Sequence, residues 1–142
     1  MASARFCAHL TGGAQVPAVS TKATGFFEMR QVNKNKMVFF LRARNLRRFT
    51  QAHIHLGGPN TNGPVVVWLF PAVKAVDPVS RPGVTEDRIT FSGTVISSHL
   101  RNNLAGDSIQ NLVNRIRSGK AYVNAHTVQY PGGEIRGQLR PC

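Results

Sequence analysis

Two neighbouring segments near the start of the sequence alternate apolar and polar residues across a tight turn. In residues 25–31, Phe27 and Met29 occupy alternate positions, and residues 36–44 repeat the pattern with Met37, Phe39, Leu41 and Ala43. Because successive side chains of a strand point to opposite faces, each segment is predicted to be a strand with one buried face. The intervening Asn33-Lys34-Asn35 indicates an antiparallel hairpin.

The same alternation or a short apolar run recurs along the chain. Further strands are predicted at residues 5–10, 52–57, 65–70, 88–95, 121–127 and 134–139. Roughly eight short strands separated by turn residues are typical of an all-β Greek-key sandwich or barrel. The segment 74–87, which contains Pro78 and Pro82, is expected to form an irregular surface loop.

One segment has helical rather than strand periodicity. Residues 108–118 place four apolar side chains on one helical face, namely Ile109, Leu112, Val113 and Ile116. Asp107 with Gln110 is predicted to form a capping box, and Gly119 is placed to end the helix. We therefore expect one short helix inserted before the last two strands.

Size and charge limit the possible functions. A chain of 142 residues suits a single domain, residues 1–142, with a core of its own. The net charge of +12 favours anionic partners, namely nucleic acid, acidic polymers at a cell surface, or small anions. Because the basic residues are scattered along the sequence, a binder of anionic polymers or nucleic acid ranks last, and nucleic acid is not expected.

Targeting signals and cysteines add little. The first residues have no apolar core, so no signal peptide is expected, and the protein is interpreted as intracellular or as an already trimmed extracellular or surface protein. The longest apolar run falls short of the roughly 20 residues of a membrane helix, so no membrane span is expected. Cys7 and Cys142 lack metal-site spacing, and whether they pair depends on the proximity of the first and last strands.

The chemistry-bearing feature is the pair His53 and His55. These residues share one face of a predicted strand, whereas Ala52, Ile54 and Leu56 face the core. Two imidazoles on one face bind a common metal ion when a third ligand arrives from elsewhere, and His126 lies in a strand of the same alternation. The alternative is that each histidine is a buried structural residue.

Several sequence blocks resemble one known family. They are residues 13–25 (GAQVPAVSTKATG), 52–57 (AHIHLG), 63–67 (GPVVV), 122–127 (YVNAHT) and 132–139 (GGEIRGQL). Together they resemble the CHRD domain, first named from chordin, over nearly the whole chain and in the family's order. The sequence departs from the family at Gln15, where glutamate is common, and at Ala18, where a second proline is common.

A weaker resemblance is to copper–zinc superoxide dismutase, a Greek-key β-sandwich. His53, His55, His126 and Arg136 match its pattern of a His-x-His pair, a later histidine and an arginine in the final strand. The loop 57–64 contains no histidine or aspartate, so a second, zinc-type site is not expected. Three imidazoles suit copper or zinc, and copper has the higher affinity.

Two functional hypotheses follow. The first is a copper-binding domain, with zinc as the alternative metal, that has Arg136 near an open position where small anions bind, and Tyr122 and Glu134 supporting the ligands. Whether such a site is catalytic stays open, and redox activity toward small anions is one form it would take. The second is a non-catalytic surface or extracellular interaction domain whose histidines are structural.

Overall fold

The computed structural model describes residues 4–71 and 88–142, so the loop expected at 74–87 lies outside the described residues. The described strands form one antiparallel sheet in the order β5-β4-β7-β8-β1-β2-β3-β6, and β9 pairs with β1. They are β1 (Arg5–Thr11), β2 (Thr24–Asn33), β3 (Lys36–Arg44), β4 (Phe49–Leu56), β5 (Val65–Phe70), β6 (Arg88–Ile96), β7 (Ala121–Thr127), β8 (Ile135–Gln138) and β9 (Arg140–Pro141).

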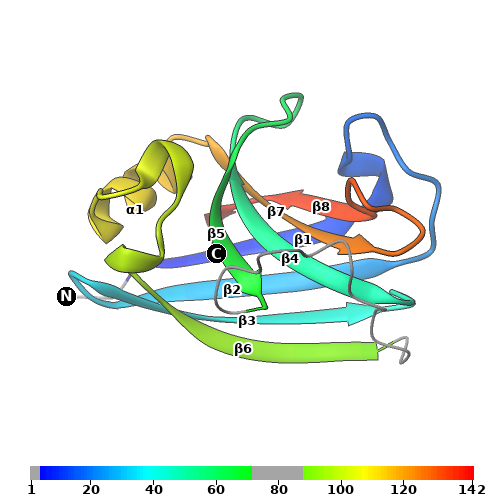
Figure 1. Ribbon diagram of the computed structural model, residues 1–142, viewed down its shortest axis with the longest axis horizontal. Coiled ribbons are helices and arrows are strands. Elements are labelled where there is room, and N and C mark those ends of the chain that lie inside the picture. Colours follow the sequence, from blue (N-terminus) through cyan, green and yellow to red (C-terminus); the bar gives the residue numbers. More distant parts are fainter. Residues whose placement is uncertain (1–3, 72–87) are drawn as a thin grey trace.

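The sheet folds over on itself into two layers. Figure 1 shows β2, β3 and β6 side by side in one layer, with β4, β5 and β7 crossing above them. The neighbours β4–β7 and β8–β1 are far apart in the sequence, so the chain crosses between layers as in a Greek key. The predicted all-β sandwich or barrel is confirmed.

The core lies between the layers and uses the predicted faces. Phe27 pairs with Leu41 and Met29 with Phe39 across β2 and β3, and all four side chains are buried. Ile89 and Val95 of β6 are buried as well, and Phe91 packs against the core. The alternation in the sequence therefore predicts this layer's orientation.

Two of the predicted strands differ from the expectation by more than small shifts at their ends. β4 begins at Phe49 rather than Ala52, because Phe49 is buried and pairs with Thr127 of β7. The last predicted strand, 134–139, is shorter in the structure, where it is β8, and a division at Leu139 separates it from β9, which the sequence did not predict. The division lets β8 pair with β7 while β9 pairs with β1.

The helix α1 (Ile109–Arg117) lies at one end of the sandwich, on the left in Figure 1. Its four predicted apolar residues are buried, which confirms the face. The predicted cap is wrong by one residue: Ser108 is the N-cap, and its side chain accepts from the Asn111 backbone N–H. Asp107 instead accepts from the Ser108 backbone N–H and the Asn111 side chain, because it lies just before the first turn. Gly119 ends the helix with a positive φ of 76°.

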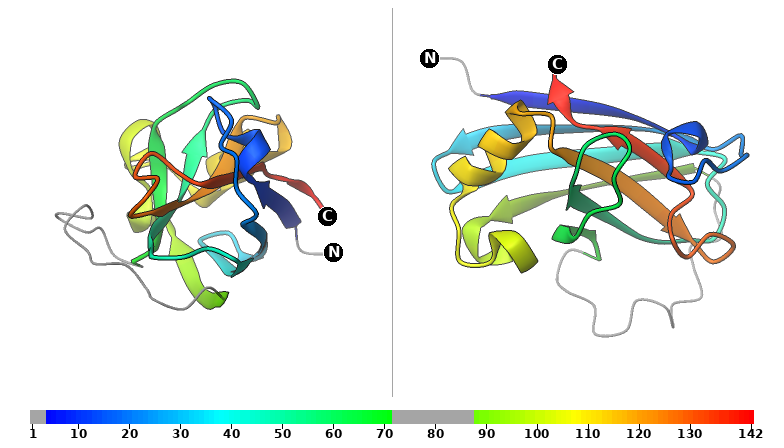
Figure 2. Two further views of the ribbon diagram at one scale, coloured as in Figure 1. Left: turned by 90° about the vertical axis from the view of Figure 1, so that its right-hand side faces the viewer. Right: turned by 90° about the horizontal axis from the view of Figure 1, so that it is seen from above.

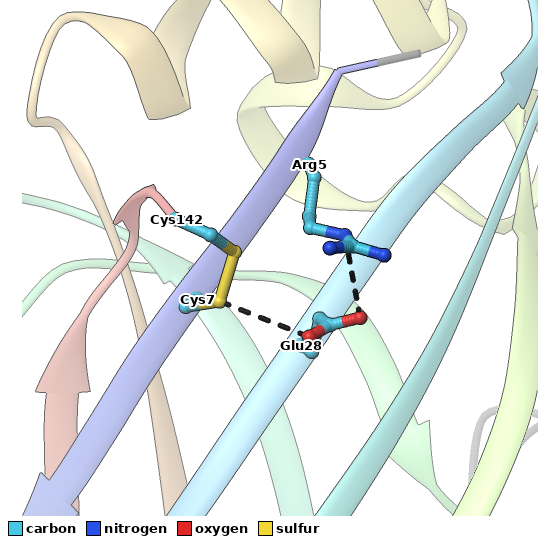
Figure 3. A network of polar contacts seen from close by, with 4 residues as sticks. All are labelled: Arg5, Cys7, Glu28 and Cys142. Carbon is cyan, nitrogen blue, oxygen red and sulfur yellow. Dashed lines mark hydrogen bonds and ion pairs between the residues drawn. A yellow bond between two sulfur atoms is a disulfide. The ribbon is translucent and has the colours of Figure 1, made fainter. Parts of the chain in front are cut away.

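The two ends of the chain meet at the edge of β1. Cys7 and Cys142 form a disulfide, and Glu28 of β2 lies beside it and pairs with Arg5 at 3.6 Å (Figure 3). β9 brings Cys142 to this position by pairing Arg140 with Cys7. Among the described residues, no helix combines the length and apolar character that crossing a membrane would require.

Candidate metal centre

The three predicted histidines lie together. His53 and His55 come from β4 and His126 from the neighbouring β7, and their ring nitrogens lie within 4.8 Å of one another. Antiparallel pairing places them on one face, since His53 is opposite Asn124 and Gln51 is opposite His126. All three side chains are buried, with exposed fractions of 3% for His53, 8% for His55 and 7% for His126.

Loops cover this face of the sheet, which is the face opposite the core. The loop that joins β4 to β5, residues 57–64, folds back over β7 and β8 in the view from above (Figure 2). The loop after β7 supplies the Pro131 carbonyl oxygen to His126. We call the residues beneath these loops the covered face. It consists of His53 and His55 of β4, Tyr122, Asn124 and His126 of β7, and Arg136 and Gln138 of β8.

The backbone fixes the tautomers of two histidines. Nδ1–H of His55 donates to the Gly63 carbonyl oxygen at 2.9 Å, and Nδ1–H of His126 donates to that of Pro131 at 2.8 Å. A carbonyl oxygen only accepts, so the proton must be on Nδ1 in each ring. The Nε2 atoms of His55 and His126 are then lone-pair donors that point into the cluster, as in histidines that bind metals.

His53 completes the cluster through its other nitrogen. Its Nδ1 lies 3.2 Å from Nε2 of His126. Two ligands of one tetrahedral ion, each about 2.0 Å from it, would be about 3.3 Å apart. The separation therefore fits two ligands of one ion as well as a hydrogen bond between the two rings. Nε2 of His53 is buried and has no hydrogen-bond partner among the described residues, and the ring packs edge-on against Trp68 of β5.

Asn124 is the residue that sequence reasoning missed. Its Oδ1 lies 2.9 Å from Nε2 of His55 and 3.0 Å from Nε2 of His126. It shares the face of Tyr122 and His126, but nothing in the sequence distinguishes it from an ordinary strand asparagine. Because all three atoms carry lone pairs, the centre of the cluster is a group of acceptors.

Burial keeps the cluster neutral. Desolvation is the largest cause that lowers the pKa of His53 to about 2, with the neighbouring His126 and His55 adding to the shift. Burial likewise lowers the pKa of His126 to about 4 despite the Pro131 hydrogen bond, and it lowers the pKa of His55. Protonation therefore does not supply the missing donors at neutral pH.

Tyr122, predicted to support the ligands, and Arg136, predicted to lie near an open metal position, form a stack on His55. The Tyr122 ring lies parallel to the His55 ring at 4.8 Å, and the Arg136 guanidinium lies 3.5 Å from the centre of the Tyr122 ring. Arg136 donates to the Gly58 and Thr61 carbonyl oxygens and to Asn62, all in the covering loop, and burial lowers its pKa. Its hydrogen bonds therefore hold the loop that carries Gly63.

Glu134 is buried next to the site rather than within the histidine cluster. Its carboxylate accepts from the hydroxyls of Thr21 at 2.7 Å and Thr127 at 2.8 Å, and from the Gln129 side chain at 3.2 Å. These contacts tie residues that precede β2 to the loop after β7. Glu134 thus acts on the covering loops, and it is not among the three clustered residues that could hold a metal.

A family model matches nearly the whole chain. A model of the CHRD domain matches residues 6–139, which include every residue of the cluster. The chain belongs to the CHRD domain family. Comparison with curated proteins and with solved structures gives no match.

One departure of this CHRD domain from the family pattern lies close to the cluster. Gln15 is buried, and its Nε2 has no hydrogen-bond partner among the described residues. A Cβ added to Gly133 would contact both Gln15 and the Asn124 amide, so the three residues are packed together. In the described part of this domain, the buried side-chain polar atoms without a hydrogen-bond partner are Gln15 Nε2 and His53 Nε2. His53 belongs to the covered face, and Gln15 packs against Gly133 and Asn124 beside it.

Proposed function

We propose that this CHRD domain binds one transition-metal ion through Nδ1 of His53 and Nε2 of His55 and His126. Copper is the expected metal and zinc the alternative, because imidazole suits both and copper has the higher affinity. The site residues Tyr122, Arg136 and Glu134 would act behind the ligands.

A single observation carries the proposal. His55 and His126 each have a carbonyl oxygen at Nδ1 and the Asn124 oxygen at Nε2. A neutral imidazole has one N–H, so one acceptor contact on each ring lacks a proton. A buried unsatisfied contact costs about 1–3 kcal/mol. A cation bound to Nδ1 of His53 and to Nε2 of His55 and His126 would replace that cost with favourable coordination.

The supporting residues favour a preorganised site. The Gly63 and Pro131 carbonyls orient two ligand rings. In metalloproteins, losing a hydrogen bond of this kind to a ligand weakens metal affinity by about 10–100-fold. Arg136 holds the loop that supplies Gly63, and Tyr122 packs on His55 while its hydroxyl accepts from the Gly63 N–H at 3.0 Å. Glu134 would maintain the second covering loop.

Reactivity toward small anions is the further part of this proposal. Three imidazoles leave a coordination position for water or an anion. The positive charge of the domain favours anion approach. Arg136 was expected to attract the anion directly; its hydrogen bonds point to the covering loop, so we assign it a positioning role and retain anion binding at the metal as a prediction.

The alternative is a non-catalytic surface or extracellular interaction domain with structural histidines. If the Asn124 amide presents its NH₂ group to the cluster, it donates to both Nε2 atoms and no metal is needed. The buried, fully packed position of the histidines is compatible with this arrangement.

Copper titration followed by electron spin resonance tests the two functions. We expect about one Cu(II) per chain, with nitrogen hyperfine structure that the His53→Ala/His126→Ala variant loses. His9→Ala/His99→Ala is the matched control, because it also removes two imidazoles but from outside the cluster, and it should bind as the unchanged protein does. A signal that survives in the first variant, or is lost equally in both, would reject the site.

A further inference from the structure

The layer opposite the metal centre presents a strongly basic surface. The side of β1, β2, β3 and β6 that faces away from the core, with Arg140 of β9, is called the basic face. It carries Arg5, Arg30, Lys36, Arg42, Arg44, Arg88 and Arg140. In the described part of the chain, the acidic side chain on this face is Glu28, and it pairs with Arg5 (Figure 3). The register therefore gathers charges that are scattered in the sequence.

Some of these arginines form cross-strand pairs of like charge. Arg44 lies directly opposite Arg88, and Arg5 directly opposite Arg30. Like charges at opposite positions destabilise a sheet. The pair Arg44 and Arg88 has no acidic partner among the described residues. An arrangement that costs stability in the free protein points to a negatively charged ligand.

A groove crosses the same face. Two adjoining hollows of about 520 and 340 Å³ share His9 and Phe26 as lining residues. Arg140 lines the first, and Arg42 and Arg44 line the second. The groove thus has cationic groups at both ends and passes over β1 and β2.

The span of the groove requires a ligand with repeated charges. Arg140 and Arg42 are separated by three strand-to-strand steps, from β9 across β1 and β2 to β3. At about 4.8 Å a step the two backbone positions lie about 14 Å apart across the strands, and Arg42 lies a further two residues along β3. One sulfate or carboxylate cannot contact both ends, whereas a short stretch of polyanion can.

The aromatic residues argue against nucleic acid. Proteins bind single-stranded nucleic acids by stacking the bases on exposed aromatic side chains. Phe26 is already packed, with the His9 ring at 5.2 Å, the Phe40 ring at 5.9 Å and the Arg42 guanidinium at 5.6 Å. The disulfide Cys7–Cys142 adds a second argument, since disulfides persist in oxidising compartments outside the cytosol.

We propose that the basic face binds an acidic polysaccharide that carries sulfate or carboxylate groups, laid across the strands from Arg140 past His9 to Arg42 and Arg44. Guanidinium groups form paired hydrogen bonds with such groups, which suits arginine over lysine. This binding does not depend on the metal ion, although Gln138 of the covered face lines the first hollow.

Calorimetric titration with dextran sulfate near physiological salt tests the proposal on the full chain. We expect binding of dextran sulfate, none of neutral dextran, and weaker binding of polyuridylate at equal charge. Arg42→Glu/Arg44→Glu should weaken the affinity by about tenfold or more. Arg47→Glu/Arg115→Glu changes the net charge equally at exposed positions off this face, and should weaken it by less than about threefold.

Each other outcome overturns the proposal. No binding of dextran sulfate removes the ligand class, tighter binding of polyuridylate favours nucleic acid, and equal loss in both variants means that net charge alone matters. Modification of arginines by phenylglyoxal locates the bound ligand without any mutation.

Dextran sulfate should protect Arg42, Arg44 and Arg140 from this modification but not Arg47 or Arg115, in metal-free and copper-loaded protein alike. Uniform protection would also reject the site.

Discussion

The covered face and the basic face both lie on the side of the folded sheet that points away from the core, but their polar groups are paired in opposite ways. On the covered face, the Arg136 guanidinium is buried beneath a loop and donates to that loop. On the basic face, Arg42 and Arg44 are exposed. A buried polar group must be paired within the protein, whereas an exposed one is paired by solvent or by a ligand.

This difference in burial decides which observation indicates a binding site on each face. On the covered face the informative signal is an unsatisfied atom, such as His53 Nε2, or a cluster of acceptors without protons. On the basic face, exposure makes single unpaired charges ordinary, and the informative signal is their unfavourable arrangement, such as Arg44 opposite Arg88.

Lowering the pH should destabilise the fold mainly through the buried histidines of the covered face. His53 and His126 have pKa values lowered from 6.5 to about 2 and about 4. Above pH 6.5 both are neutral in the folded and unfolded chains, so they contribute nothing to pH dependence. Below it the unfolded chain binds protons that the folded one does not, so stability falls as pH falls, by about 1.4 kcal/mol per pH unit and histidine.

Urea unfolding of the metal-free protein measures this effect. The free energy of unfolding should be about 4 kcal/mol lower at pH 5 than at pH 7. His53→Gln/His126→Gln should remove most of the difference. Equal stability at the two pH values would contradict the neutral, buried cluster.

Matched arginine substitutions compare the two faces directly. Arg136→Met removes a buried guanidinium that makes hydrogen bonds to Gly58, Thr61 and Asn62, and it should destabilise the fold by about 3 kcal/mol. Arg42→Met makes the same chemical change on the basic face and should alter stability by less than about 0.5 kcal/mol. Similar losses in the two variants, by thermal or urea unfolding, would mean that the faces do not differ as described.

A pair of glycine substitutions tests the loop over the metal centre. A Cβ added to Gly63 would collide with the Leu56 carbonyl oxygen, so the loop must shift and move the Gly63 carbonyl away from His55. Gly63→Ala should weaken copper affinity by about tenfold, the lower range for losing a contact behind a ligand. Gly58→Ala is the control, since its added Cβ meets nothing within 4 Å. Unchanged affinity in Gly63→Ala would remove this carbonyl from the site.

Much of the fold could be predicted from the sequence because its signals are local. Alternation assigns Phe27, Met29 and their partners to the core, and helical spacing assigns the buried face of α1. The pair His53 and His55 shares a face for the same reason. The cap was misassigned because Asp107 and Ser108 are both good capping residues, and only the path of the chain into the helix selects Ser108.

The remaining features depend on which distant strands pair. Asn124 meets His55 because β4 and β7 are neighbours, although the two residues are 69 positions apart. The basic face arises in the same way, since Arg44 and Arg88 come together only through the register of β3 with β6. No local pattern encodes such pairings, so charges that are scattered in the sequence wrongly indicate that no face of the domain is strongly basic.

The disulfide between Cys7 and Cys142 has a mechanical consequence. It joins residues 135 positions apart, so every strand from β2 to β8 belongs to one covalently closed ring. A pull applied to these two residues is carried by the sulfur–sulfur bond, and the backbone hydrogen bonds of the sheet bear little of it. Tension at this corner would therefore leave β4 and β7, and the histidines they hold, unloaded until the bond is reduced.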